Sequence, residues 1–127
     1  MNETGQKILI VDDDLLLAKS LEKQFTEAGY RVVTAHDGEA GFETFKNERP
    51  DIVLMDVMMP KKTGIEMLKD IREKLPESDV PFIVLSSMNE MDKVAEAMSH
   101  GARAYLLKSD NQIDEVVTAV EEKLRNA

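Results

Sequence analysis

The segment from Asp51 to Pro60 (DIVLMDVMMP) limits the fold more than any other part of the chain. Ile52 to Met55 form an unbroken apolar run, and a second apolar run follows Asp56 until Pro60 ends it. Such a run is typical of a strand buried on both faces, as a central parallel strand must be. Asp56 lies where that strand leaves the sheet. A carboxylate among apolar neighbours there is costly unless a cation, a hydrogen bond or chemistry uses it.

The rest of the chain alternates strand and helix patterns. The predicted strands are Lys7–Val11, Arg31–Thr34, Ile52–Met55, Pro81–Leu85 and Arg103–Leu107. Apolar residues at helical spacing follow each strand; they are Leu17, Leu21 and Phe25; Ala40, Phe42 and Phe45; Ile65, Leu68, Ile71 and Leu75; Met91, Val94, Ala95 and Met98; and Ile113, Val116, Val117, Val120 and Leu124. Gly29 and Gly101 are predicted helix stops, and Thr63 to Glu66 match a capping box. Gly41 should make the second helix the weakest.

Five strand–helix pairs without a repeat or linker predict one doubly wound α/β domain over residues 1–127. Right-handed crossovers should place helices on both faces of a five-stranded parallel sheet. We expect flexible ends at about residues 1–6 and 126–127.

Composition excludes several classes of protein. No apolar run approaches the roughly 20 residues of a membrane span, and the first residues do not resemble a secretory signal, so we expect a cytoplasmic protein. The absence of cysteine excludes disulfides, thiolate metal sites and cysteine nucleophiles. A net charge of −9 argues against direct nucleic-acid binding and favours a divalent cation or a basic partner.

Polar residues collect at the ends of the predicted strands. The first strand is followed by Asp12 and Asp13, the third by Asp56, the fourth by Ser86 and the fifth by Lys108. Two unit charges about 4 Å apart interact by roughly 4 kcal/mol at an effective dielectric constant near 20, so the carboxylates need a cation. Oxygen ligands suit Mg²⁺, and a lysine and a hydroxyl could hold an anionic group at Asp56. This set predicts a phosphoryl-accepting site.

Four motifs in the same order make the chain similar to the receiver domain of two-component response regulators over essentially its whole length. They are Ile8–Asp14, Asp51–Pro60 with Gly64, Ile83–Ser87 and Gly101–Lys108. Each motif is weak alone, but four in register are specific. The resemblance implies a flavodoxin-like strand order 2-1-3-4-5, for which a receiver is a reference example.

The resemblance also implies a chemical role for each matching residue. Asp56 would be the phosphorylation site, attacking the phosphohistidine of a histidine kinase or phosphotransfer protein. Asp13 and Asp56 would ligate Mg²⁺ directly, Asp12 would act largely through water, and the Met58 carbonyl would complete the metal site. Lys108 would pair with a phosphoryl oxygen.

Two further residues would act as the switch. Ser86 would move towards the acyl phosphate, and Tyr105 would change rotamer as space opens behind it. The fourth helix, fifth strand and fifth helix would then bind a downstream protein that the sequence does not identify, or a second copy of the chain. The protein would be a phosphoacceptor that catalyses its own phosphorylation and dephosphorylation, and not an enzyme with a separate substrate.

The chain departs from the family pattern after Lys108, where Ser109 replaces the usual proline. A cis bond before a residue other than proline costs about 2.5–4 kcal/mol, so we expect a trans Lys108–Ser109 bond and a shifted loop. Met58 and Met88 are also unusual, since in the family these positions flank the path of the hydrolytic water. Thioethers cannot orient that water, which predicts a long-lived phosphorylated state.

Simpler interpretations remain for several residues. Asp14 is interpreted as an exposed acid in the first helical turn and Asp51 as a surface residue. Ser86 could cap the next helix, although Ser87 with Glu90 offers a rival capping box. Tyr105 could be a core residue. Lys108 could merely snorkel from its strand end. Of the remaining candidates, Met91 and Met98 are interpreted as helix packing, and His36 and His100 as surface residues.

Two other functions compete with a signalling switch. One is a Mg²⁺-dependent phosphatase with an aspartyl nucleophile in Asp12-x-Asp14, although the chain has no cap domain for a substrate. The other is a flavodoxin-like cofactor binder, although the first loop is acidic and would repel a phosphate.

Overall fold

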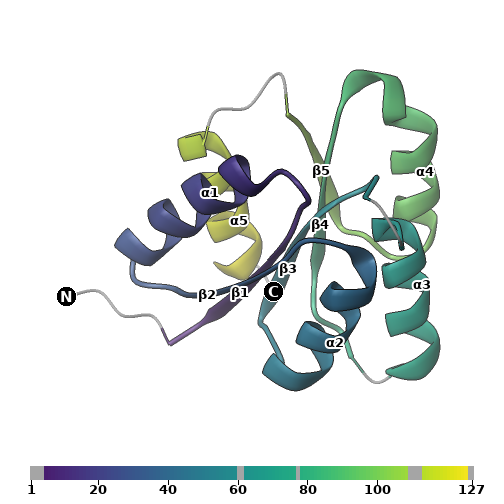
Figure 1. The fold of residues 1–127 in the computed structure, drawn as a ribbon, viewed down its shortest axis with the longest axis horizontal. Helices are drawn as coiled ribbons and strands as arrows, with labels where there is room; N and C mark the ends of the chain where they lie inside the picture. Colours follow the sequence, from purple (N-terminus) through teal and green to yellow (C-terminus); the bar gives the residue numbers. More distant parts are fainter. Residues whose placement is uncertain (1–4, 60–61, 77, 109–112, 126–127) are drawn as a thin grey trace.

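The structure is a computed structural model, and it describes residues 5–59, 62–76, 78–108 and 113–125. Within these residues five strands alternate with five α-helices (Figure 1). In chain order the elements are β1 (Lys7–Val11), α1 (Leu15–Glu27), β2 (Arg31–Ala35), α2 (Gly38–Glu48), β3 (Ile52–Asp56), α3 (Gly64–Lys74), β4 (Phe82–Ser86), the single 3₁₀ turn η1 (Met88–Glu90), α4 (Met91–Ser99), β5 (Ala104–Leu107) and α5 (Ile113–Arg125).

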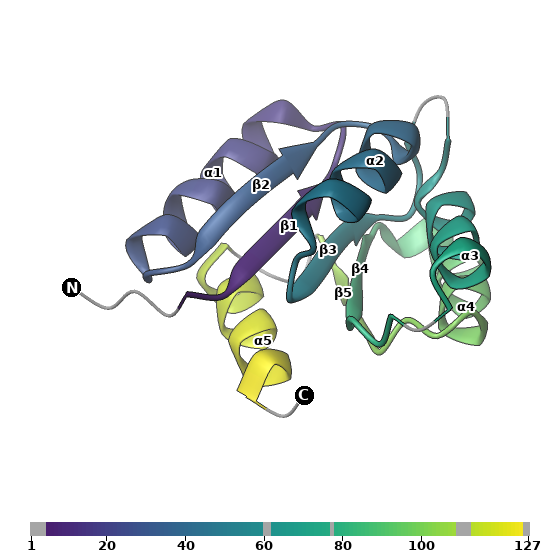
Figure 2. The ribbon, with the colours of Figure 1, turned by 90° about the horizontal axis from the view of Figure 1, so that it is seen from below.

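All five strands are parallel and lie in the order β2-β1-β3-β4-β5, which confirms the predicted doubly wound sheet. Helices α1 and α5 cover one face, and α2, α3 and α4 cover the other (Figures 1 and 2). The order in which strands are added to the sheet reverses between β1 and β3. Their carboxyl ends therefore lie side by side at the switch point where such folds bind ligands.

The core consists of two layers, one on each face of the sheet. Every residue of β3 and of β4 is buried, as the unbroken apolar sequence of β3 predicts. Alternate residues of each strand face opposite layers, so Leu54 packs with the α1 and α5 side chains and Met55 with those of α2, α3 and α4. The core therefore holds the end of β3 rigidly in place.

Polar residues just before a helix fix the position at which the helix begins. Thr63 and Glu66 form the predicted capping box at α3, with Glu66 accepting from the Thr63 amide at 2.9 Å. Asp14 corrects our prediction: it is the N-cap of α1, accepting from the Leu17 amide at 3.1 Å, and does not lie in the first turn. An N-cap aspartate satisfies a helix amide that has no intrahelical partner, which explains the position.

Three further predictions need correction. The boundaries of β2, β3, β4 and β5 differ from the predicted strands by one residue, because ladder hydrogen bonds and not residue type decide where pairing ends. Met91 and Met98 do not pack in the core, since they are 37% and 38% exposed. His100 is half-buried as the C-cap of α4, whereas His36 is exposed as predicted.

Some predictions fall outside the part of the chain that the structure describes. They are most of the flexible ends, the Lys108–Ser109 bond and the side chain of Met88. Within the described ranges, no helix is both long and apolar enough to cross a membrane.

Gly41 gives a test of the packing between α2 and the sheet. An added Cβ would lie 2.5 Å from Met67 Sδ and 3.0 Å from Val11 Cγ1, and both neighbours are fully buried. We therefore expect Gly41→Ala to lower the free energy of unfolding by about 1–2 kcal/mol, although alanine has the higher helix propensity. Urea unfolding measures the change. Asn47→Ala, at an exposed position of α2, should cause no loss, and a stabilised Gly41→Ala would contradict the packing argument.

Candidate functional site

The carboxyl ends of β1, β3, β4 and β5 bring the predicted site residues together. Pairing of Val11 with Met55 and of Asp56 with Leu85 aligns these ends. One carboxylate oxygen from each of Asp12, Asp13 and Asp56 lies within 4.8 Å of the others. The convergence that the sequence predicted is therefore present.

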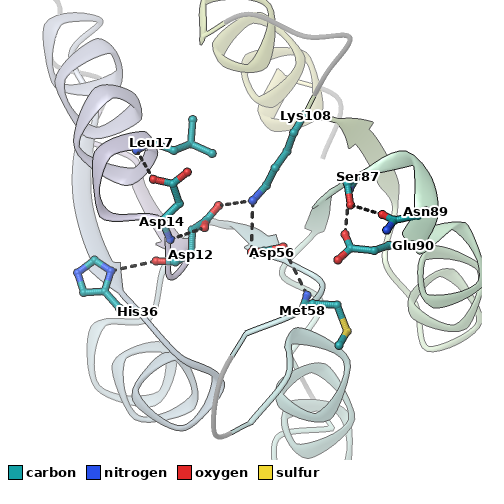
Figure 3. A network of polar contacts seen from close by, with 10 residues as sticks. All are labelled: Asp12, Asp14, Leu17, His36, Asp56, Met58, Ser87, Asn89, Glu90 and Lys108. Atoms are coloured by element: carbon teal, nitrogen blue, oxygen red, sulfur yellow. Dashed lines mark hydrogen bonds and ion pairs between the residues drawn. The ribbon is translucent and has the colours of Figure 1, made fainter.

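Lys108 lies between the two buried carboxylates (Figure 3). Its Nζ is 3.3 Å from Asp12 Oδ2 and 3.3 Å from Asp56 Oδ2. Asp12 is fully buried and Asp56 is 5% exposed, so the ammonium, whose side chain is 29% exposed, balances the charge of two carboxylates that water barely reaches. This contact excludes the interpretation of Lys108 as a side chain that only snorkels to solvent.

Burial and mutual repulsion change the ionisation of this group. Burial and the charge of Asp12 raise the pKa of Asp56 to about 7, against the opposing effect of Lys108. Burial also raises the pKa of Asp12, while the Asp14 amide and Lys108 act to lower it. For Lys108, burial would lower the pKa, but Asp56 and Asp12 together raise it above its ordinary value. The site therefore favours binding of a further cation.

Asp12 is held in place by its surroundings. Its Oδ1 accepts from the Asp14 amide at 2.9 Å, and its backbone carbonyl oxygen lies 3.0 Å from His36 Nδ1 (Figure 3). Sequence reasoning missed both contacts. The first is a local bond between residues two apart, and the second needs the β1–β2 pairing that brings His36 from the end of β2 to Asp12. Asp51, in contrast, is an exposed residue that accepts from the Lys7 amide at 2.8 Å, as predicted.

Ser86, the last residue of β4, is fully buried, and its Oγ has no hydrogen-bond partner among the residues that the structure describes. A buried hydroxyl without a partner costs about 1–3 kcal/mol, so this group is available for a ligand. Its backbone carbonyl accepts from the Lys108 amide at 2.8 Å, which joins the ends of β4 and β5. The next residue, Ser87, donates its amide to the Glu90 carboxylate at 2.9 Å, so the following turn does not use Ser86 as a cap (Figure 3).

Met58 and Tyr105 lie near the surface. The Met58 amide lies 3.4 Å from Asp56 Oδ1, and its side chain is 40% exposed (Figure 3). Tyr105 is 43% exposed on β5, which excludes the core interpretation. Together with Met91 and Met98 it gives the α4–β5 side of the molecule several exposed apolar side chains.

The three carboxylates fit a hard divalent cation. Asp13 is exposed and Asp12 and Asp56 are buried, so an ion there would have both protein and solvent on its sides. Asp12 Oδ2 is buried without a hydrogen bond among the described residues, apart from its ion pair with Lys108. An oxygen-only donor set that is open to water suits Mg²⁺.

Comparison with known proteins gives consistent matches. The sequence model of the response regulator receiver domain matches residues 8–121. The "Probable transcriptional regulator ycf27" of Guillardia theta is 38% identical over 120 residues, which are 93% of this chain and 46% of that protein. The "Transcriptional regulatory protein PdtaR" of Mycobacterium tuberculosis is 34% identical over 117 residues, which are 91% of this chain and 55% of that protein. The chain thus spans about half the length of these curated relatives.

Solved structures agree with the fold. The receiver domain of the Francisella response regulator 1452 has a TM-score of 0.84 at 29% identity, covering 96% of this chain and 98% of that one. The chemotaxis response regulator CheY4 of Vibrio cholerae has a TM-score of 0.84 at 28% identity, covering 94% and 98%.

The raised pKa of Asp56 predicts how stability changes with pH when no divalent cation is present. An unfolded aspartate has a pKa near 3.9, so between about pH 4 and pH 7 the folded protein keeps a proton on Asp56 that the unfolded chain releases. Raising the pH through this window should therefore lower the free energy of unfolding. We expect Asp56→Asn to exceed the wild type in stability by on the order of 2 kcal/mol at about pH 7.5, and by much less at about pH 4.5.

Urea unfolding in the presence of a chelator measures both values. Glu73→Gln, which removes an exposed carboxylate from α3, is the matched control and should follow the wild type at both pH values. Equal stability of Asp56→Asn and the wild type near neutral pH would mean that the buried charge of Asp56 does not destabilise the folded protein.

Proposed function

Because this chain belongs to the response regulator receiver domain family, we propose that it is a phosphorylation-activated signalling switch with Asp56 as the phosphoryl acceptor. The observation that supports this most is the position of Lys108 Nζ, 3.3 Å from both Asp56 and Asp12, whose carboxylates are buried. A cation fixed beside a carboxylate oxygen is suited to a phosphoryl group that arrives at that oxygen.

The proposed reaction is a transfer between two side chains. An Asp56 carboxylate oxygen forms a bond to phosphorus while the bond from phosphorus to the imidazole nitrogen of a partner's phosphohistidine breaks. The electron pair of that bond returns to the imidazole, and the product is an aspartyl phosphate. Lys108 would stabilise the negative phosphoryl oxygens, and its ion pair with Asp12 would keep the ammonium in position.

Mg²⁺ would be held by Asp12, Asp13 and Asp56, with the Met58 carbonyl as a further proposed ligand. When bound it supplies Lewis-acid charge that offsets both the clustered carboxylates and the incoming phosphoryl group. Asp12 itself, being fully buried and paired with Lys108, is poorly placed to act as a phosphatase nucleophile, and Asp14 is occupied in capping α1.

The switch is proposed to act through Ser86 and Tyr105. The buried Ser86 hydroxyl would donate to a phosphoryl oxygen, which gives its Oγ the partner that it lacks among the described residues. Charge-assisted bonds of this kind are worth about 1.5–3 kcal/mol each, and moving a two-state equilibrium from mostly off to mostly on needs about 5.5 kcal/mol. Contacts from Ser86 and Lys108 together are of that order.

The proposed partners follow from this chemistry. A sensor histidine kinase or phosphotransfer protein would donate the phosphoryl group, and the face formed by α4, β5 and α5 would bind a downstream protein or a second copy. Receiver domains are phosphoacceptor switches and not enzymes in the usual sense. The net charge of −9 argues against direct nucleic-acid binding by this domain, and a cytoplasmic location stays a prediction.

The acceptor can be tested without the natural partner. We expect wild-type protein incubated with Mg²⁺ and acetyl phosphate to gain the mass of one phosphoryl group, measured on the intact protein, and Asp56→Asn to gain none. Chelation of the metal should abolish labelling, because the carboxylate cluster would then repel the donor. Asp51→Asn, at the opposite end of β3, is the matched control and should label like the wild type. Labelling of Asp56→Asn would contradict the assignment.

The lifetime of the phosphorylated state tests the predicted effect of Met58 and Met88 on hydrolysis. Met58→Gln combined with Met88→Gln adds groups that can orient a hydrolytic water, so we expect dephosphorylation to accelerate by roughly fivefold, the equivalent of about one hydrogen bond. Loss of the phosphoryl mass over time gives the rate. Met98→Gln on α4 is the control. A short-lived wild-type phosphoprotein with the same rate in the double variant would refute the hypothesis.

A further inference from the structure

Arg72, near the end of α3, contacts two loops on the side of the molecule away from Asp56. Its Nε donates to the His100 carbonyl at 3.3 Å, its Nη2 to the Gly101 carbonyl at 3.2 Å and its Nη1 to the Ser78 carbonyl at 3.3 Å. The guanidinium also lies over the Phe82 ring, 5.3 Å from its centroid. One side chain thus connects α3, the loop before β4 and the turn between α4 and β5.

The two carbonyls at His100 and Gly101 belong to the C-terminal end of α4. The Gly101 amide donates to Met98 and the Ala102 amide to Ala97, which is a Schellman arrangement with Gly101 at φ +100°. An added Cβ on Gly101 would lie 3.1 Å from Arg72 Nε and Nη2, so the turn packs closely on the guanidinium.

Helix α4 has no basic residue in its own last turn. A cation at a helix C-terminus stabilises the partial negative charge of the unpaired carbonyls. Arg72 therefore supplies from α3 the charge that α4 lacks, and its planar guanidinium reaches three carbonyls in different directions, which a lysine cannot do.

The polar contacts at the other end of α4 are local: among the described residues, the Glu90 carboxylate accepts from the Ser87 amide at 2.9 Å, which forms the capping box of the preceding 3₁₀ turn. The N-cap of α4, Glu90, makes no side-chain capping bond to the helix. The 3₁₀ turn before it starts directly after Ser86 and Ser87, and among the described residues of α4 only Val94 and Ala97 are buried. The end of α4 that adjoins Ser86 is therefore held by contacts within its own turn, whereas the end near Gly101 is tied to α3 by Arg72 (α3 and α4 lie side by side in Figures 1 and 2).

We propose that Arg72 is a positioning residue that pins the C-terminal end of α4 to α3, so that any rearrangement of α4 occurs as a tilt at its N-terminal end. This inference rests on the proposed switch for its functional meaning, but the pin itself is a property of the unphosphorylated protein. The two ends of α4 would then behave differently: the end near Ser86 moves on phosphorylation, and the end near Gly101 stays fixed as the pivot.

Amide hydrogen exchange of the full chain, followed by mass spectrometry, tests the pin without phosphorylation. Arg72→Gln should increase exchange in residues 97–104 by about tenfold, the loss expected for a charged group with several hydrogen bonds, and leave residues 87–93 within about twofold. Arg72→Lys, which keeps the charge but not the divergent bonds, should give an intermediate increase. Lys74→Gln is the matched control, since Lys74 is an exposed basic residue in the same last turn of α3 and should leave residues 97–104 unchanged.

The same measurement on protein whose phosphorylation is verified by mass tests the pivot. In the wild type the change on phosphorylation should lie in residues 87–93 and spare residues 97–104, whereas in Arg72→Gln it should spread to both segments. Equal changes at both ends of wild-type α4, or no difference between Arg72→Gln and Lys74→Gln, would overturn the proposal. Absence of any phosphoryl mass would count against the proposed function, and the unphosphorylated comparison would still decide whether Arg72 pins α4.

Discussion

The interaction on which the site depends is the ammonium of Lys108 held between the buried carboxylates of Asp12 and Asp56. Two desolvated negative charges so close together would otherwise destabilise the folded protein. The pKa of Asp56 is raised by burial first and by the charge of Asp12 second, and a single lysine does not cancel these two effects. The negative charge of the site is therefore only partly balanced, and further positive charge would stabilise the folded protein. In the proposed function, a divalent cation held by Asp12, Asp13 and Asp56 would supply that charge and prepare the site for a phosphoryl group.

The parallel sheet makes this arrangement available. Because β1, β3 and β5 run in the same direction, the polar residues at their carboxyl ends meet on one edge, although Asp12 and Lys108 are 96 positions apart in the chain. Because β3 and β4 are fully buried, they fix the positions of Asp56 and Ser86, which are their last residues. Backbone pairing of the Lys108 amide with the Ser86 carbonyl then sets where the lysine begins its reach towards the carboxylates.

The side of the molecule that carries α4 and β5 is built differently from the rest. Its exposed side chains include Met91, Met98 and Tyr105, whereas α3 buries five residues of its eleven. A short helix with two buried residues gains little from packing, so its position depends on the contacts at its ends. That balance is what a switching element requires, because a difference of a few kcal/mol can then move it.

Much of this protein was determined by its sequence alone. The apolar run of Ile52 to Met55, the strand–helix alternation and the acids after the first and third strands predicted a parallel sheet and the carboxylate cluster, because hydrophobic periodicity is a local property and right-handed crossovers make successive strands parallel. The strand order itself came from the resemblance to receiver domains. Only the tertiary structure decided that Asp14 caps a helix, that His36 lies against Asp12, and that Met91 and Met98 face outward. It alone also brought Arg72 to the end of α4. These features depend on which surfaces of neighbouring elements meet, and helical spacing cannot tell a buried apolar residue from one whose side of the helix the fold leaves uncovered.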